Sequence, residues 1–375
     1  MGGAMAFYRH FFERDDFEVF VATNDKNVLN HHLPCEVLVF ERSRVWQRLI
    51  KTRLYRFAHS LQHLLEGEFI PDEIRAAARR FQPDVIFTIA GTWGATTRMA
   101  EKLSNELGVP LATSFNDWFD FSIIVHPAFR SILEKRFRSV YRNSDVAFCT
   151  SDGMRNALGP HSNAHVLFPI GGLRVSSQSE NSEPVEAGSV VFAGNLGNWY
   201  GPMLERLVTA SQSAGLATTF RIYGDLAKWS AEFDEFAKSR NIFRGHLPFQ
   251  KLLPELRKAD ALLLLMGFGK DCELVERTSF KTKFLDYLSV GRPVFVWGPT
   301  YCSAVGYAKE FDSAEVCTEE NPTAAALGLS RLLADSFRKK ELTVNAERMY
   351  ADRFHPDKIH QVFLDGLRHI PKRCE

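Results

Sequence analysis

The chain has 375 residues, of which 45% are hydrophobic, and its formal net charge is +1. This length favours two domains, and the near-neutral charge argues against a general nucleic-acid-binding protein, which is usually strongly basic. The six cysteines are scattered without a C-x-x-C pair, which suits reduced thiols in a cytoplasm better than a disulfide framework or a zinc site. The sequence has no apolar run near the roughly 20 residues of a membrane span and no signal-peptide pattern at its start.

The first half of the chain, residues 1–170, alternates between short apolar strands and helices. Strands are predicted at residues 17–23, 35–41, 84–91, 110–117 and 146–151. Helices are predicted at residues 44–70, 71–82, 93–108, 126–145 and 152–159. Alternation of this kind predicts an α/β fold with a parallel sheet covered by helices.

One element is missing from the first half. A doubly wound domain normally opens with a buried apolar strand that leads into a glycine loop, but here Gly2 and Gly3 have nothing before them. Either the start was assigned downstream of the true one or the first strand is missing. We therefore expect a central gap or an altered edge in the first sheet.

The second half begins after residues 170–188, which are rich in Gly, Ser, Glu and Asn and have the composition of a linker. From Ser189 to Pro299 the pattern again alternates strand, glycine turn and helix. A helix near residues 303–311, a strand near 314–319 and helices at 321–335, 337–352 and 356–370 follow. Turns after parallel strands, each opening a helix, are where nucleotides and phosphates bind.

Two stretches of the second half resemble a known family. SFKTKFLDYLSVGRPVFVWGP (279–299) is similar to a P-x-K-x-x-E-Y-L-A-x-G-K-P-V stretch, with Lys283 at the lysine and Asp286 at the acidic position. FRGHLPFQKLLPELRKADALLLL (243–265) is similar to a G-x-x-P-x-x-x-L-x-x-x-x-x-A-D stretch, with Gly245 at its glycine. The two family stretches come from the donor domain of GT-B glycosyltransferases, in particular the large retaining family 4, which the second half of this chain therefore resembles.

The resemblance implies a GT-B fold, with two Rossmann-like doubly wound domains facing across a cleft. Residues 1–170 would bind the acceptor, residues 189–355 would bind a nucleoside diphosphate sugar, and the helix at 356–375 would cross back to the first domain. The implied reaction is hexosyl transfer with retention to a glycan, lipid-linked or small-molecule acceptor. No D-x-D string is present, so we expect no metal and no cofactor besides the donor substrate.

Donor-side candidates lie at the start of the predicted helix 279–290. Hydroxyls and free N–H groups at Thr278 and Ser279, together with Lys281 and Lys283, could form an anion site for the diphosphate. The plain alternative is two solvated lysines and a helix N-cap. Asp286 would accept ribose hydroxyls, as its family position implies, or would pair with a neighbouring cation.

Further donor-side candidates follow the strands that begin at residues 189 and 243. In GNLGNWYG (194–201), Gly194 and Gly197 allow close backbone approach, Asn195 could bind phosphate or sugar, and Trp199 could stack on a sugar or cover the core. By family position His246 lies beside the nucleobase.

Acceptor-side candidates lie in the first half. Asp117 and Asp120 follow a predicted strand and could act as a base toward an acceptor hydroxyl, or could simply cap a turn. The acceptor-side loops would be formed by Gly2 and Gly3, which resemble the family's glycine loop, and by Gly91, Thr92 and Trp93.

Residues 44–57 are basic and amphipathic, a combination that can lie on an anionic membrane or bind a lipid-linked acceptor, although a solvated helix face explains it too. We expect a cytoplasmic protein with peripheral membrane contact through this segment and no nucleic-acid partner.

Several family positions differ. The loop 194–201 has no basic residue, Thr278 stands where a first catalytic acid would fall, and Asn116 stands near a family histidine. These departures keep open a catalytically inactive GT-B protein that binds a nucleotide sugar or acts as a scaffold. A sugar-nucleotide epimerase is a further alternative.

Overall fold

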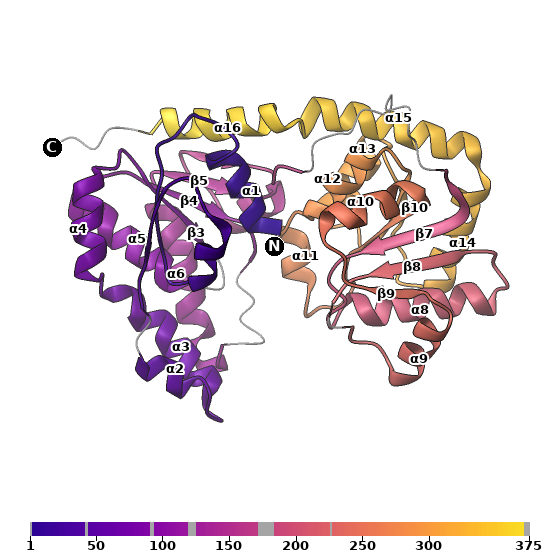
Figure 1. Ribbon diagram of the computed structural model, residues 1–375, viewed down its shortest axis with the longest axis horizontal. Helices are drawn as coiled ribbons and strands as arrows, with labels where there is room; N and C mark the ends of the chain where they lie inside the picture. The colour runs from indigo at the N-terminus through magenta and orange to yellow at the C-terminus, as the bar shows by residue number, and fades with distance from the viewer. Residues whose placement is uncertain are drawn as a thin grey trace. The chain divides into compact units, whose positions relative to one another are not determined.

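The computed structural model describes residues 2–41, 44–90, 94–118, 125–171, 184–225 and 227–370. The chain forms two compact units (Figure 1). Unit 1 comprises residues 1–169 and 359–375, and unit 2 comprises residues 170–358. Among the described residues, no helix has the length and apolar character that crossing a bilayer requires.

The elements of unit 1 follow the predicted alternation. Its strands are β1 (Phe20–Thr23), β2 (Glu36–Val39), β3 (Ile86–Ala90), β4 (Leu111–Phe115), β5 (Val146–Cys149) and β6 (Ala164–Val166). Its helices are α1 (Gly2–Phe11), α2 (Arg44–Leu49), α3 (Tyr55–Leu65), α4 (Asp72–Phe81), α5 (Gly94–Leu107), α6 (Arg130–Asn143), α7 (Asp152–Leu158) and most of α16 (Pro356–Arg368). Short 3-10 turns η1 (Lys26–His31), η2 (Glu66–Glu68) and η3 (Pro127–Phe129) complete the unit.

The strands of unit 1 fall into two parallel sheets. One has the order β3-β4-β5-β6, and the other is the pair β1-β2. Within the described residues no strand is hydrogen-bonded to both sheets. The division corresponds to the interruption that the sequence predicts for the first domain.

The expected glycine loop at Gly2 and Gly3 is wrong, because both residues belong to α1. The helix is held by its aromatic side chains. The ring of Phe7 packs against Phe87 of β3 at 5.1 Å, and the ring of Phe11 packs edge-on against Phe363 of α16 at 5.4 Å. This packing favours a helix although two glycines stand in its first turn.

Unit 2 is a complete doubly wound domain. Its strands are β7 (Glu186–Ala193), β8 (Thr219–Tyr223), β9 (Phe243–Gly245), β10 (Ala259–Leu265), β11 (Val294–Trp297) and β12 (Glu315–Cys317). Its helices are α8 (Tyr200–Ser213), α9 (Ala231–Ser239), α10 (Phe249–Lys258), α11 (Glu273–Thr278), α12 (Thr282–Val290), α13 (Ser303–Glu310), α14 (Pro322–Ala334) and α15 (Ser336–Arg353). All strand pairs are parallel, in the order β12-β11-β10-β7-β8-β9.

Helices cover both faces of this sheet (Figure 1). The helices α8, α9 and α14 bury their apolar side chains with Val190, Phe192 and Ile222 on one face. The helices α10, α12 and α13 contact the sheet on the other face. The central strands β7 and β10 are therefore almost wholly apolar, as expected of parallel strands that are covered on both sides.

Candidate functional site

The strand order of unit 2 locates the candidate site. The neighbouring strands β7 and β10 lie at the centre of the sheet, and the chain proceeds from β7 to one edge and from β10 to the other. Such a switch in strand order opens a crevice at the carboxyl ends of the two strands, where open α/β sheets bind their ligands. Here those ends are Gly194 after β7 and residues 266–267 after β10.

The turn after β7 favours glycine at its first position. The φ angle of Gly194 is +153°, and a Cβ atom there would lie 1.7 Å from Nζ of Lys283. The Gly194 N–H donates to the Tyr223 carbonyl at 2.8 Å, which fixes the turn against β8. The end of the Lys283 side chain occupies the space next to Gly194.

Lys283 is the central cation of the site. Its Nζ atom lies 4.9 Å from the ring centre of Phe192 and 5.7 Å from that of Tyr200. Within the described part of the chain it has no hydrogen bond or ion pair. Burial, and then the positive charge of Lys281, lower the pKa of Lys283 to about 8. An ammonium group without a counter-ion in the first turn of α12 is suited to binding an anion.

A buried ion pair lies beside Lys283. The carboxylate of Glu276 is fully buried and accepts hydrogen bonds from the Tyr200 hydroxyl at 2.6 Å and the Gly267 N–H at 3.0 Å. Its other oxygen lies 3.0 Å from Nζ of Lys281. Burial opposes the charge of Lys281, but Tyr200 and Glu276 outweigh it and raise the lysine's pKa. Lys281 is therefore neutralised locally, and Lys283 remains as the surplus positive charge.

The remaining candidates after β7 are held by side-chain hydrogen bonds. Asn195 Oδ1 accepts from the Gly197 N–H at 2.7 Å, which closes the turn. The Trp199 indole N–H donates to Asp271 at 2.8 Å, so the ring is fixed beside the segment after β10. The Trp199 ring is a flat, partly exposed surface at the site.

Two predicted hydroxyls lie elsewhere than expected. The predicted helix 279–290 begins only at Thr282, because Thr278 ends the preceding short helix α11. The Thr278 hydroxyl is fully buried and donates to the Leu274 carbonyl at 2.8 Å. Ser279 is buried next to it at the turn between the two helices. Asp286 lies one turn beyond Lys283 on α12, as predicted.

His246 lies after β9, the edge strand of the sheet. Its Nδ1 atom is 3.0 Å from the Asp225 carboxylate, and both side chains are exposed. Gly245, just before it, has a φ angle of +72°. The histidine is therefore held by an acidic residue at the carboxyl end of the sheet, and the structure does not place it beside Lys283.

The acceptor-side candidates lie in unit 1. Asp117 is exposed just after β4, and the neighbouring Asn116 accepts from the Ser114 hydroxyl at 2.8 Å. Asp120, Gly91, Thr92 and Trp93 lie outside the described residues. Among the residues that the structure describes, no three His, Cys, Asp or Glu side chains are grouped as a metal site.

Solved structures show the same architecture. HepE from Anabaena has a TM-score of 0.64 at 14% identity, over 98% of this chain and 95% of its own. A glycosyltransferase from Rickettsia africae has a TM-score of 0.64 at 11% identity over 94% and 89%. S. aureus TarM has a TM-score of 0.57 at 9% identity, and this chain spans 58% of its length.

The chain has the GT-B fold. No family model matches the sequence, and no curated protein matches it either. HepE was solved with UDP and glucose, and TarM was solved with UDP. Within this GT-B fold, Lys283, Lys281 and Glu276 lie at the carboxyl ends of the central strands of unit 2.

Proposed function

We propose that the protein is a glycosyltransferase that moves a hexosyl unit from a nucleoside diphosphate sugar to a glycan, lipid-linked or small-molecule acceptor. The observation that carries this proposal is the Lys283 ammonium, which has no ion pair among the described residues and lies at the switch point of unit 2, beside the turn at Gly194. The GT-B fold adds support, since the solved structures that resemble this chain are glycosyltransferases, HepE among them in complex with UDP-glucose.

In the proposed reaction, Lys283 stabilises the diphosphate as the anomeric bond breaks. Negative charge grows on the leaving oxygen at that moment, and a positive group already fixed in place lowers the barrier most effectively. The first turn of α12 adds backbone N–H groups and the positive end of its dipole. Protein groups alone would neutralise the leaving group, so the proposal needs no metal.

The neighbouring groups have supporting roles. The Glu276 carboxylate holds Lys281 in place and cancels its charge, so the bound diphosphate would draw mainly on Lys283. Asp286 would accept ribose hydroxyls from the nucleoside, and Trp199 would offer its ring to the sugar. The likeness of residues 279–299 to the retaining family favours retention at the anomeric carbon.

On the acceptor side, Asp117 is the proposed contact for the attacking hydroxyl, with Asp120 as its neighbour in sequence. Asp117 is exposed at the carboxyl end of β4, where a side chain can reach a ligand. A lipid-linked acceptor would be met at a membrane surface.

A binding protein without turnover is the second candidate. Two positions favour the binding protein. Asn116 stands near the place of the family's histidine and Thr278 at the place of its first acid, and Thr278 is fully buried. Both candidates bind the nucleotide, and only the enzyme releases nucleoside diphosphate when an acceptor is present.

Calorimetric titration with UDP, GDP, TDP and ADP and their glucose conjugates tests the proposal. We expect one nucleotide series to bind and Lys283→Met to weaken it by roughly 10- to 100-fold, as for the loss of a charged hydrogen bond. Lys340→Met is the matched control, because Lys340 is exposed on α15. Release of UDP in the presence of candidate acceptors would then separate the enzyme from the binding protein. Equal affinity in both variants, or no binding at all, would refute the donor site.

A further inference from the structure

The segment between β2 and η2 has an unusual charge pattern. Residues 42–65 contain six Lys or Arg residues and no Asp or Glu, although the whole chain is almost neutral. This segment forms α2 and α3, and five of its cations (Arg44, Arg48, Lys51, Arg53 and Arg56) lie in or between the two helices. The positive charge is thus concentrated on one part of unit 1.

The same part of unit 1 exposes large apolar side chains. Val45 is 62% exposed and Leu54 is 67% exposed, and Leu49, Tyr55 and Phe57 are each at least 40% exposed. Single exposed apolar residues are common, but here five lie within 13 positions. We call residues 45–57 the basic apolar surface.

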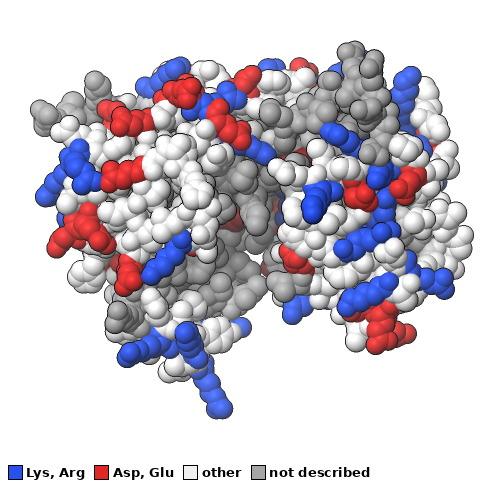
Figure 2. All heavy atoms as spheres, in the orientation of Figure 1, with Lys and Arg blue, Asp and Glu red and all other residues white. Residues whose placement is uncertain are grey.

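The cations of the basic apolar surface are available to a partner. Arg48, Lys51 and Arg53 are exposed, and no carboxylate in the described part of the chain pairs with them. The Arg56 guanidinium donates a hydrogen bond of 3.1 Å to the hydroxyl of its neighbour Tyr55, and no carboxylate among the described residues pairs with it. Figure 2 shows Lys and Arg side chains gathered at the lower end of unit 1, where Figure 1 places α2 and α3.

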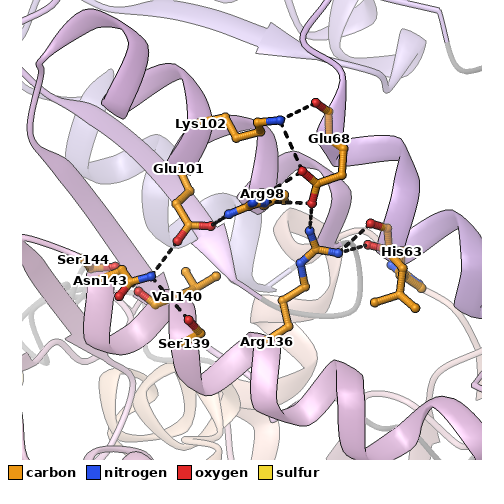
Figure 3. A network of polar contacts seen from close by, with 11 residues as sticks. His63, Glu68, Arg98, Glu101, Lys102, Arg136, Ser139, Val140, Asn143 and Ser144 are labelled. Atoms are coloured by element: carbon orange, nitrogen blue, oxygen red, sulfur yellow. Dashed lines mark hydrogen bonds and ion pairs between the residues drawn. The ribbon is translucent and has the colours of Figure 1, made fainter.

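This surface rests on a well-packed base. The Ser60 hydroxyl on the inner side of α3 accepts from the His126 N–H at 2.9 Å, and the ring of Phe57 packs edge-on against Phe129 at 5.2 Å. At the end of α3, Arg136 donates to the Leu64 carbonyl at 2.7 Å and pairs with Glu68 (Figure 3). The inner side of α3 is therefore packed against other elements of unit 1, while Val45, Leu49 and Leu54 remain exposed.

We propose that the basic apolar surface binds an anionic lipid bilayer. Lys and Arg are attracted to acidic headgroups, and apolar side chains between them gain free energy by entering the boundary between headgroups and acyl chains. A nucleic acid would satisfy the cations but would leave Val45 and Leu54 in water. The inference goes beyond glycosyl transfer, since it concerns where the protein acts and stands whether or not a donor binds.

Co-sedimentation of the full chain with vesicles tests the proposal. We expect binding to vesicles of phosphatidylcholine with 30% phosphatidylglycerol, roughly tenfold weaker binding to pure phosphatidylcholine, and weakening as salt rises. The triple variant Arg48→Glu, Lys51→Glu, Arg53→Glu should lose at least tenfold in partition coefficient. Val45→Ser with Leu54→Ser should also reduce binding, because serine cannot contribute apolar burial.

The control is a second triple variant, in which the same change of charge is made in unit 2. Lys309, Lys340 and Arg348 are exposed, and each would be replaced by Glu. This variant should bind vesicles within about twofold of the wild type, and circular dichroism should show all variants folded. Absence of vesicle binding, or equal loss in both triple variants, would overturn the proposal. The proposal would also be overturned if the Val45→Ser, Leu54→Ser variant bound vesicles as well as the wild type and RNA competed with the vesicles for binding. UDP titration of each variant reads the donor site separately.

Discussion

At the scale of single residues, the site is defined by Lys283, whose ammonium forms no ion pair with any residue that the structure describes. Lys283 and Lys281 lie two positions apart, yet Glu276 neutralises only Lys281, at 3.0 Å. In water such an imbalance costs little, but burial of the Lys283 ammonium is unfavourable and lowers its pKa. The unfavourable burial of this charge in the absence of a ligand is what an anion-binding site would require.

Lys283→Met should therefore stabilise unit 2 when no ligand is present. The native pKa of about 8 lies below the usual value of 10.5, so at pH 7 the lysine is charged in both states and the native state carries the burial cost. As pH rises from 8 to 10.5 the native lysine loses its proton first, and the wild type gains stability relative to the variant. We expect the variant to be more stable by about 2 kcal/mol at pH 7, with the difference shrinking by pH 10.

Urea unfolding at pH 7 and pH 10 measures both differences. Lys340→Met serves as the control, since an exposed lysine should change stability by less than about 0.5 kcal/mol at either pH. A Lys283→Met variant that is less stable than the wild type at pH 7 would show that the native ammonium has a favourable partner.

The sequence predicted part of this site. Lys283 and Asp286 were predicted from the likeness to the family motif and Gly194 from the glycine turn after a strand, and the structure brings Lys283 and Gly194 together. Glu276 was not predicted as a site residue, because it does not fall at the acidic position of the family motif. It reaches the site through α11, a separate short helix. No local pattern indicates that a charged side chain will be fully buried next to Gly267.

At the scale of elements, strongly periodic segments were predicted and weakly patterned ones were missed. The central strands and the helices between them follow the sequence because they are apolar on the faces they bury. The strand β6 (Ala164–Val166) is only three residues long, and α1 begins with two glycines. Both depend on contacts with distant residues, as when Phe7 packs on Phe87, so local propensity does not reveal them.

The junction of α3, η2, α5 and α6 is held by a network of ion pairs between residues that are distant in sequence (Figure 3). Glu68 pairs with Arg98, Lys102 and Arg136, and these bonds, led by that from Arg98, lower its pKa to about 2. Arg136 also donates to the carbonyl of Leu64 at the end of α3. One arginine therefore joins three elements.

Arg136→Met should lower the free energy of unfolding of unit 1 by about 2 kcal/mol, because the α3 carbonyls lose their donor and Glu68 loses one of three cations. Urea unfolding measures the change, and hydrogen exchange should show faster opening of α3. Arg142→Met on the same helix is the control, because Arg142 is exposed. Similar losses in the two variants would contradict the role given to the network.

At the scale of the whole molecule, unit 1 is built from both ends of the chain. Residues 359–375 belong to it although unit 2 precedes them in sequence. His10 of α1 and His360 of α16 share a hydrogen bond of 3.0 Å, and the other ring nitrogen of His360 lies 2.9 Å from Asp16. The fold of unit 1 is therefore completed by a helix that follows unit 2 in sequence.

Phe363 is the side chain that secures this arrangement. It is fully buried, and its ring lies within 6 Å of the rings of Phe11, Phe87 and Phe148. Replacing it with alanine would remove a large apolar surface and leave a cavity among aromatic rings that cannot all move to fill it. We expect Phe363→Ala to destabilise unit 1 by roughly 3–5 kcal/mol.

The measurement must distinguish the unfolding of unit 1 from that of unit 2, because the segment that contains Phe363 follows unit 2 directly in sequence. Calorimetry together with hydrogen exchange should show the loss in α1, β3 and β5, while the segments of unit 2 remain protected as in the wild type. Phe337→Ala is the matched control, because Phe337 is 78% exposed on α15 and its removal should change stability by less than about 0.5 kcal/mol. If exchange in Phe363→Ala instead rose first in β7 and β10, α16 would be stabilising unit 2, and the two ends of the chain would not act as one fold.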